Sequence, residues 1–160
     1  MELKVVKVDI PEGHNIILGQ THFIKTVEDL YEIMASTVPN AKFGIGFCEA
    51  SGACLVRLEG NDEGLKKTAE TMAMEISAGH TFVVVMKDAF PINVLNAIKM
   101  CQEVCSIYCA TANPVEVLIA ETDLGRGIVG VIDGYKSKGI ETDDDIAARK
   151  DLLRKIGYKQ

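Results

Sequence analysis

The sequence predicts an α+β fold: a mixed or antiparallel sheet from two similar β-α-β-β halves, with helices packed on one face. Three observations support this prediction. Short apolar runs typical of strands alternate with segments of helical spacing. Both halves show these elements in the same order. The 160 residues, 48% of them hydrophobic, suit one compact domain with a substantial core.

The first half begins with strand signals. Residues 3–10 alternate apolar and polar side chains, which predicts a half-buried edge or first strand. Residues 15–23 predict a second strand, and we expect Thr26 to cap the helix TVEDLYEIMAST that follows it. Residues 42–49 predict a third strand, which residues 53–58 would complete as a hairpin.

Two glycines, Gly44 and Gly46, lie inside the third strand. Because glycine weakens a strand, its presence there indicates a bulge or the close approach of another backbone. Asn61 and Asp62 then offer an N-cap for a second helix, and Gly79 lies just past its expected end.

The second half repeats the pattern. Residues 80–86 are nearly all apolar after the first and predict a central strand. Pro91 is a helix-start signal, so residues 91–104 predict a third helix. Its expected inward residues are Val94, Leu95, Ile98 and Met100.

The last part of the chain reads as three strands and a helix. Residues 104–109, 115–120 and 128–132 are strand-like, and residues 141–157 predict a final helix. That helix has acids at its start and bases at its end, in the sense that the helix dipole favours. Its apolar side would be Ile146, Leu152, Leu153 and Ile156.

The two predicted hairpins can be set side by side. KFGIGFCEASGACLVRLEGND and VEVLIAETDLGRGIVGVIDG both place an apolar run that ends in glutamate before a glycine-containing turn and a second run. This indicates an internal duplication of about residues 15–60 and 80–134 within a single domain of residues 1–160. The duplication would place Glu49 opposite Glu121.

Composition excludes several classes of protein. A net charge of −6 and a pI near 5.1 argue against nucleic acid as a partner. No apolar run is long enough to span a membrane, and the start of the chain does not resemble a signal peptide. Five cysteines, an odd number without a CxxC pair, are expected to be reduced thiols in a cytoplasmic protein.

The glycines at 125, 127 and 130 spell G-x-G-x-x-G. A dinucleotide-binding loop would need a helix after them, whereas residues 128–132 are strand-like. No P-loop motif is present either. We therefore expect these glycines to serve a tight hairpin, by supplying positive φ angles.

Carboxylates at the ends of buried strands are the leading catalytic candidates. Glu49, Glu121 and Asp123 each follow such a strand, a position that suits a functional role and also a structural one. Arg57 and Arg126 would either pair with these acids or bind phosphate.

Other polar residues suit a nucleotide. Lys25 and His80 stand near strand ends, where they would neutralise an anion, although a structural histidine is the commoner case. The amides of Asn93, Asn96 and Asn113 would suit an adenine edge, although cap and turn roles are ordinary alternatives.

Several long runs of the chain resemble the adenosine-specific kinase family of small archaeal and bacterial proteins. These runs are GQTHFIKTVEDLYE, KFGIGFCEASG, VRLEGND, AGHTFVV, AFPINVLNAIK, CATANPVEVLIAET and GRGIVGVIDG, with IGYK near the end. They cover nearly the whole chain in the family's order. The resemblance implies an adenosine-binding pocket and ATP-dependent phosphorylation of adenosine or AMP.

The expected function follows from this resemblance. A kinase-type phosphotransferase without a P-loop would use ATP and Mg²⁺, with Glu121, Glu49 or Asp123 holding the metal or accepting a proton. Arg126, Lys25 and His80 would neutralise phosphate, while Asn93, Asn96, Asn113 and Phe90 would hold the nucleoside. The alternatives are a non-catalytic adenine-nucleoside sensor and a purely structural oligomer. We expect a homo-oligomer, with a trimer as the first guess.

Overall fold

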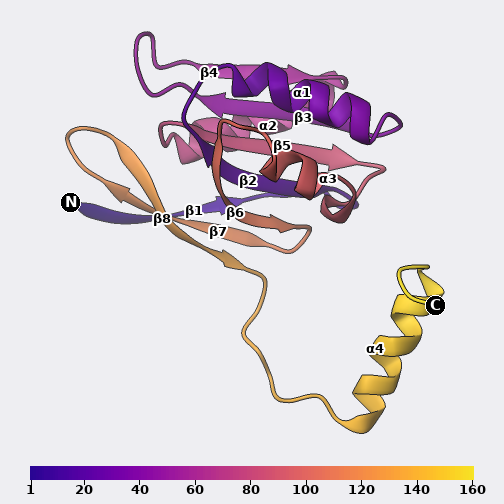
Figure 1. Cartoon of the computed structure of the whole chain (residues 1–160). Coiled ribbons are helices and arrows are strands. Elements are labelled where there is room, and N and C mark those ends of the chain that lie inside the picture. Colours follow the sequence, from indigo (N-terminus) through magenta and orange to yellow (C-terminus); the bar gives the residue numbers. More distant parts are fainter.

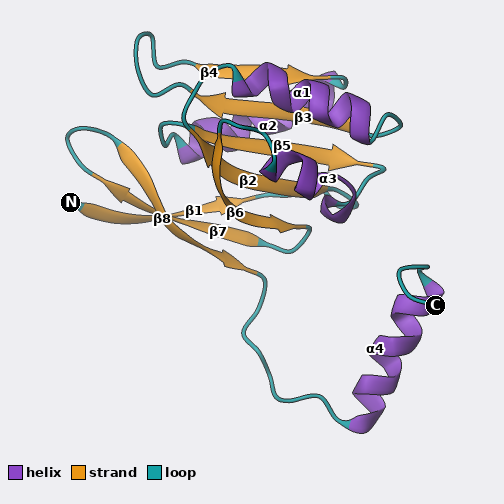
Figure 2. Ribbon diagram, viewed as in Figure 1, coloured by secondary structure: helices purple, strands orange, loops and turns teal.

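The computed structural model describes residues 1–160 as two antiparallel sheets and four helices (Figures 1 and 2). This confirms the predicted α+β class. The strands are β1 (Glu2–Val8), β2 (Asn15–Thr21), β3 (Lys42–Cys48), β4 (Val56–Gly60), β5 (Thr81–Lys87), β6 (Val104–Thr111), β7 (Val115–Glu121) and β8 (Arg126–Asp133). The helices are α1 (Thr26–Thr37), α2 (Glu63–Ile76), α3 (Pro91–Lys99) and α4 (Asp143–Lys155).

The larger sheet has the strand order β4-β3-β5-β2-β6. Its central strand is β5, as the apolar run of residues 80–86 predicted, and six of its seven residues are buried. Helices α1 and α3 pack on one face of this sheet through a core that includes Leu30, Phe43 and Ile98. Helix α2 packs on the other face, so the expectation that the helices cover one face was wrong.

The smaller sheet has the strand order β1-β7-β8. Its inner residues Val117 and Ile119 share a core with Met72 and Ile76 of α2 and with Leu18 of the larger sheet. The prediction of one sheet therefore needs correction to two. The layers are α1 and α3, then the larger sheet, then α2 together with the smaller sheet (Figure 1).

The glycines of β3 permit α2 to lie directly on the strand. A Cβ atom at Gly44 would lie 2.2 Å from the backbone carbonyl of Leu65, and one at Gly46 would lie 2.8 Å from the carbonyl oxygen of Ala69. No side chain fits at such distances. The close backbone approach that the sequence indicated at these glycines is therefore confirmed.

Helix starts and ends agree with the sequence only in part. Asp62 caps α2, since its carboxylate accepts a hydrogen bond from Leu65 N at 3.0 Å. Thr26 is not the cap of α1; it lies inside the helix, and its hydroxyl donates to the Phe23 carbonyl at 2.6 Å. Helix α3 ends at Lys99, so Met100 lies beyond it and is 83% exposed rather than inward.

The chain after β8 leaves the body of the molecule. Residues 134–160 form an extended segment followed by α4, and α4 stands apart from both sheets (Figure 1). The capping box of Thr142 and Asp145 starts this helix, and no residue of the helix is buried. We call residues 134–160 the arm. No helix of the chain is long and apolar enough to span a membrane.

Candidate functional site

The β3–β4 hairpin places a paired carboxylate directly after β3. The side chain of Glu49 is 16% exposed and accepts a hydrogen bond from the backbone N–H of Leu55 at 3.0 Å. Both of its carboxylate oxygens lie 3.2 Å from Nη2 of Arg57. The Leu55 N–H, and after it Arg57, hold the pKa of Glu49 below its usual value. Glu49 is therefore ionised at neutral pH and is a poor proton acceptor.

The β7–β8 hairpin repeats this arrangement with an additional cation. Oε2 of Glu121 accepts from Nζ of Lys4 at 2.9 Å and from Nε of Arg126 at 2.5 Å. The bond from Lys4, followed by the bond from Arg126, lowers the pKa of Glu121. Arg126 also donates through Nη1 to the carbonyl of Glu75 in α2, at 3.1 Å. The hairpin is thereby tied to the end of α2.

A groove of about 780 Å³ lies between the two hairpins, beside the end of α2. Its apolar walls include Leu55 and Val56 from one side, Leu124 and Ile128 from the other, and Met74 from α2. Glu49 and Arg126 also line it. The groove therefore combines apolar walls with one carboxylate and one guanidinium, a composition typical of small-molecule sites.

A smaller, polar hollow of about 370 Å³ adjoins the groove. The two spaces share Met74, Ser77, Thr122, Leu124, Gly125 and Arg126. Glu121 and Asp123 line only the hollow. The structure thus places Glu49 in the wall of the apolar groove, Glu121 and Asp123 in the wall of the polar hollow, and Arg126 in the wall of both.

Strained backbone surrounds this space. Cys54 and Ser77 line the groove with left-handed φ angles of 51° and 49°, although neither residue is glycine. His80, which follows the groove residue Gly79, has a φ of 63°. Non-glycine residues adopt this conformation infrequently, and such strain tends to gather at functional sites.

His80 connects three strands through its backbone. Its N–H donates to the Cys48 carbonyl at 2.7 Å, and its carbonyl accepts from Thr21 N at 2.9 Å. Its half-buried ring lies 6.1 Å from the ring of Phe47, between centroids. No hydrogen bond occupies either ring nitrogen. His80 is therefore beside the groove but is not one of the residues that line it.

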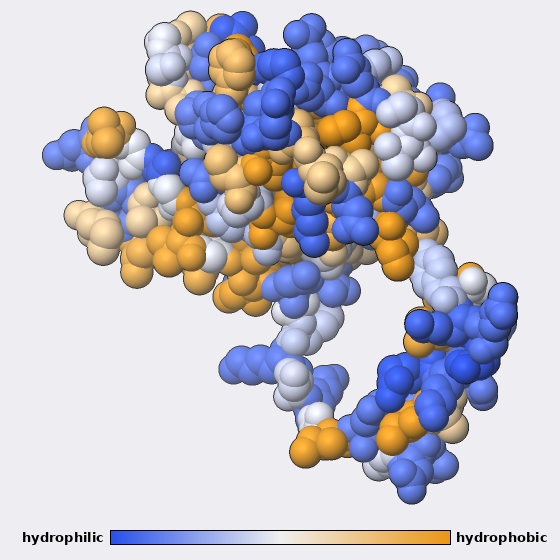
Figure 3. Space-filling model, in the orientation of Figure 1, coloured by the Kyte–Doolittle hydropathy of each residue, from blue (hydrophilic) through white to orange (hydrophobic).

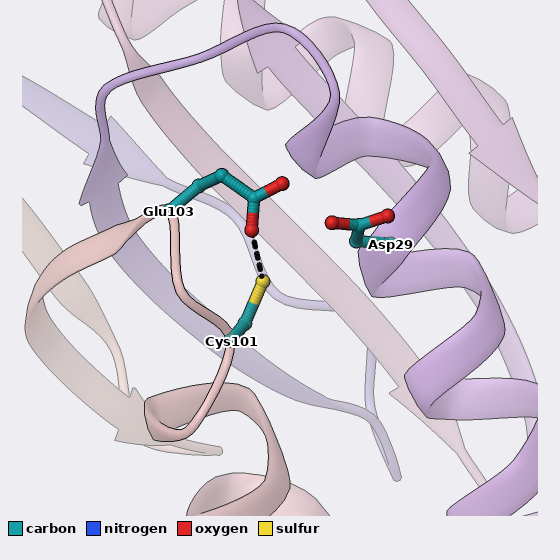
Figure 4. A group of neighbouring side chains, drawn as sticks. All are labelled: Asp29, Cys101 and Glu103. Atoms are coloured by element: carbon teal, nitrogen blue, oxygen red, sulfur yellow. Dashed lines mark hydrogen bonds between the residues drawn. The ribbon is translucent and has the colours of Figure 1, made fainter.

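Lys25 lies in a separate cluster with Asp29, Cys101 and Glu103. Figure 4 shows the last three of these side chains. The Lys25 ammonium contacts Asp29 and lies 3.0 Å from Glu103, whose side chain is 2% exposed. Cys101 Sγ donates to Glu103 at 2.9 Å. Burial opposes ionisation of Glu103, but the bonds from Asp29, Cys101 and Lys25 outweigh it and lower its pKa to about 2.

This cluster has the ligand types of a metal site, since one ligand atom from each of Asp29, Cys101 and Glu103 lies within 4.8 Å of the others. The Lys25 ammonium already supplies the positive charge that Asp29 and Glu103 need. The four N–H groups at the start of α1 are also occupied, by the carbonyls of Phe23, Ile24 and Lys25. Lys25 therefore has no free helix end beside it with which to bind an anion.

The four residues predicted to hold the nucleoside lie away from the groove. Phe90 and Asn93 follow the carboxyl end of β5, and Asn93 Oδ1 accepts from Phe90 N at 2.9 Å as a helix cap. Asn96 is exposed on α3. Asn113 precedes β7 and donates to Asp133 at 3.1 Å, whereas Glu121 ends that seven-residue strand about 20 Å away.

Sequence reasoning did not find several residues of this region. Lys4 was seen only as part of an alternating strand, and its pairing with Glu121 depends on the contact of β1 with β7. Met74 and Ser77 were not singled out, although both line the groove and the hollow. The one available signal for Ser77 was its position between a helix end and Gly79.

Comparisons with known proteins agree with this architecture. The family model described as adenosine specific kinase matches residues 6–159 of the chain. The chain belongs to the adenosine-specific kinase family. This confirms the resemblance found in the sequence. No curated protein matches the chain.

One solved structure extends the family assignment to three dimensions. The crystal structure of PH1918 protein from Pyrococcus horikoshii OT3 shares 46% sequence identity with the chain and superposes on it with a TM-score of 0.95. The alignment covers 99% of this adenosine-specific kinase family member and 98% of the relative. The fold described above is therefore also that of an experimentally determined relative.

Proposed function

We propose that the chain binds adenosine or AMP in the groove and transfers a phosphoryl group to it from ATP, with Mg²⁺, in the adjoining hollow. One observation supports this proposal most strongly: an apolar groove of about 780 Å³ adjoins a polar hollow, and Arg126 lines both. A purine needs apolar walls, while phosphates need cations and oxygen ligands for their metal. Family membership agrees with this division.

The position of Arg126 supports a role in phosphate recognition. Glu121 fixes its Nε and Glu75 fixes its Nη1, while its Nη2 makes no hydrogen bond within the chain. A guanidinium held in this way loses little conformational freedom on binding. Arg126 would neutralise phosphate charge at the junction of groove and hollow.

The carboxylates suit metal binding better than proton transfer. The lowered pKa of Glu121 keeps it ionised, and only Oε2 is used by Lys4 and Arg126. Oε1 of Glu121 and the carboxylate of Asp123 are hard oxygen donors, the type that Mg²⁺ takes in addition to phosphate oxygens. These two residues would hold Mg²⁺, which would supply charge neutralisation for the transferred phosphate.

One observation favours the non-catalytic alternative, an adenine-nucleoside sensor. Glu49 and Glu121 are both paired with cations and have lowered pKa values, so neither is poised as a general base. A sensor would need the groove but not the hollow. The two functions therefore differ in one respect: the kinase requires Mg²⁺ and ATP for turnover, whereas the sensor requires neither to bind the nucleoside.

Calorimetry and a turnover assay test the proposal. Met74 lines both the groove and the hollow, so Met74→Glu places a negative charge where it would repel the phosphate of AMP and weaken apolar contact with the purine. The affinity for AMP should fall about ten-fold or more. Met100→Glu is the matched control, because Met100 is exposed and lines neither space. Equal effects of the two variants would remove the groove from consideration.

Turnover separates the two functions. A kinase should convert ATP to ADP only with adenosine or AMP and Mg²⁺ present, and Arg126→Ala should lower this rate at least ten-fold. Adenosine binding without Mg²⁺-dependent turnover would instead support the sensor. Absence of nucleoside binding would contradict both.

A further inference from the structure

The arm is an amphipathic segment without a partner in its own chain. Ile146 and Leu153 lie seven residues apart, on one side of α4, and Leu152 and Ile156 extend that side. The last two are 56% and 51% exposed. In Figure 3 the hydrophobic side chains of the arm form orange patches that face solvent. A helix with such a side normally buries it against another element.

The arm nevertheless has a defined position. A 13-residue helix without tertiary contacts is only marginally stable in water. Residues 1–133 are too small a part of the 160-residue chain to give the TM-score of 0.95 with PH1918 protein by themselves, so the relative's crystal structure holds much of its arm in the same place. Something outside the single chain must therefore stabilise the arm.

The smaller sheet has an outer face that is also uncovered. Leu3 and Val5 of β1 are 70% and 57% exposed, and they pair across the strands with Ala120 and Leu118 of β7. Directly paired residues of an antiparallel sheet share a face, so these side chains are contiguous. Ile132 of β8 extends the strip and is 46% exposed. In Figure 3, orange areas lie on the lower part of the body, where Figure 1 places the strands of the smaller sheet.

The glycines of β8 give this face a particular shape. Gly127 and Gly130 pair with Ala120 and Leu118 on the outer face. Neither has a positive φ, and a Cβ atom at either would meet nothing within 4 Å. The expectation that these glycines supply positive φ in the hairpin was therefore wrong. In β3, strand glycines admit α2, and here the same feature lies on a face that no helix covers.

We propose that α4 of a second copy of this chain packs on the outer face of β1, β7 and β8, and that Gly127 and Gly130 admit it closely. Each copy gives one arm and receives one. Such a contact joins two different surfaces, so it closes into a ring when the rotation between copies allows. The receiving hairpin also bears Arg126, so the contact would hold one wall of the groove.

Mass measurement by light scattering during gel filtration tests the contact. Ile146→Asp with Leu153→Asp charges the apolar side of α4, and Leu3→Asp with Val5→Asp charges the face. All four positions are at least half-exposed or outside the core, so the folds should survive; thermal unfolding checks this. The wild type should have the mass of a ring of several copies, and each variant alone should have the mass of a single copy.

Mixing the two variants is the decisive step. The arm variant keeps an intact face and the face variant keeps an intact arm, so together they should form a complex of one copy each. An arm that folded back on its own chain would give no such complex. Ala147→Asp with Arg154→Gln changes the net charge by the same amount on the opposite side of α4 and should keep the wild-type mass. A monomeric wild type, an unchanged mass for the arm variant, or no complex on mixing would each overturn the proposal.

Discussion

The β3–β4 and β7–β8 hairpins share a local design but differ in what covers their glycines. In each, a glutamate after the first strand pairs with an arginine of the second: Glu49 with Arg57, and Glu121 with Arg126. In β3, a Cβ at Gly44 would lie 2.2 Å from the α2 backbone, whereas Gly127 in β8 has open space. The same strand pattern thus completes a core within the chain in one case and leaves a surface for another copy in the other.

The largest expected effect comes from filling these two glycine positions. Gly44→Ala should lower the free energy of unfolding by roughly 3 kcal/mol, because the methyl group would force α2 away from β3. Gly127→Ala should change it by less than about 0.5 kcal/mol, since the position is open and its φ is ordinary.

Urea unfolding measures both changes. The measurement belongs in the Ile146→Asp, Leu153→Asp background, where assembly cannot add to stability. Equal destabilisation by the two alanines would show that β8 is already covered within the single chain and would break the comparison.

An intermediate effect separates the two glutamates. Both have folded-state pKa values below the ordinary 4.5, so each contributes stability that is present above pH 4.5 and is lost as the pH falls through the lower folded value. Glu49→Gln and Glu121→Gln should therefore destabilise the protein at pH 7 and converge with wild type in acid. The Glu49 effect should be larger, because its side chain is 16% exposed against 30% for Glu121.

Unfolding free energies measured from pH 7 downward give this comparison. A difference from wild type that grows in acid would contradict the assigned direction of both pKa values. A larger effect at Glu121 would show that Lys4 and Arg126 stabilise the second hairpin more than burial and the Leu55 N–H stabilise the first.

The smallest expected effect is that of the arm contact on the affinity for nucleotide. Charging the face with Leu3→Asp and Val5→Asp leaves the groove residues intact but frees the outer side of the hairpin that bears Arg126. AMP affinity should fall by only a few-fold. Calorimetry of this variant checks it, and a loss as large as that of Met74→Glu would place the ligand site at the interface between copies.

Local patterns predicted most of the strands and helices. The apolar run of residues 80–86 identified β5 as central, and the strand glycines Gly44 and Gly46 identified the contact with α2. What the sequence could not supply was non-local pairing. The contact of β1 with β7 joins residues more than a hundred positions apart, and it divides the strands between two sheets. No periodicity reports such a pairing.

The candidate site was predictable to a similar extent. The likeness of the two hairpins in the sequence predicts that Glu49 and Glu121 occupy matching positions, and the two residues line the adjoining groove and hollow beside α2. Asn113 was expected to hold the nucleoside because its amide suits an adenine edge. Asn113 precedes β7, whereas Glu121 ends that strand about 20 Å away, so the kind of side chain alone did not show at which end of the sheet Asn113 lies.

Hydrogen exchange of the α4 amides tests the central claim most directly, namely that the second hairpin's open face is completed by another copy. A 13-residue helix without contacts should exchange at nearly the rate of an unfolded segment. If α4 is docked, its amides should be strongly protected in the wild type and should lose protection in the Leu3→Asp, Val5→Asp variant, while β5 stays protected in both. Unprotected α4 amides in the wild type, at concentrations where β5 is protected, would contradict the account.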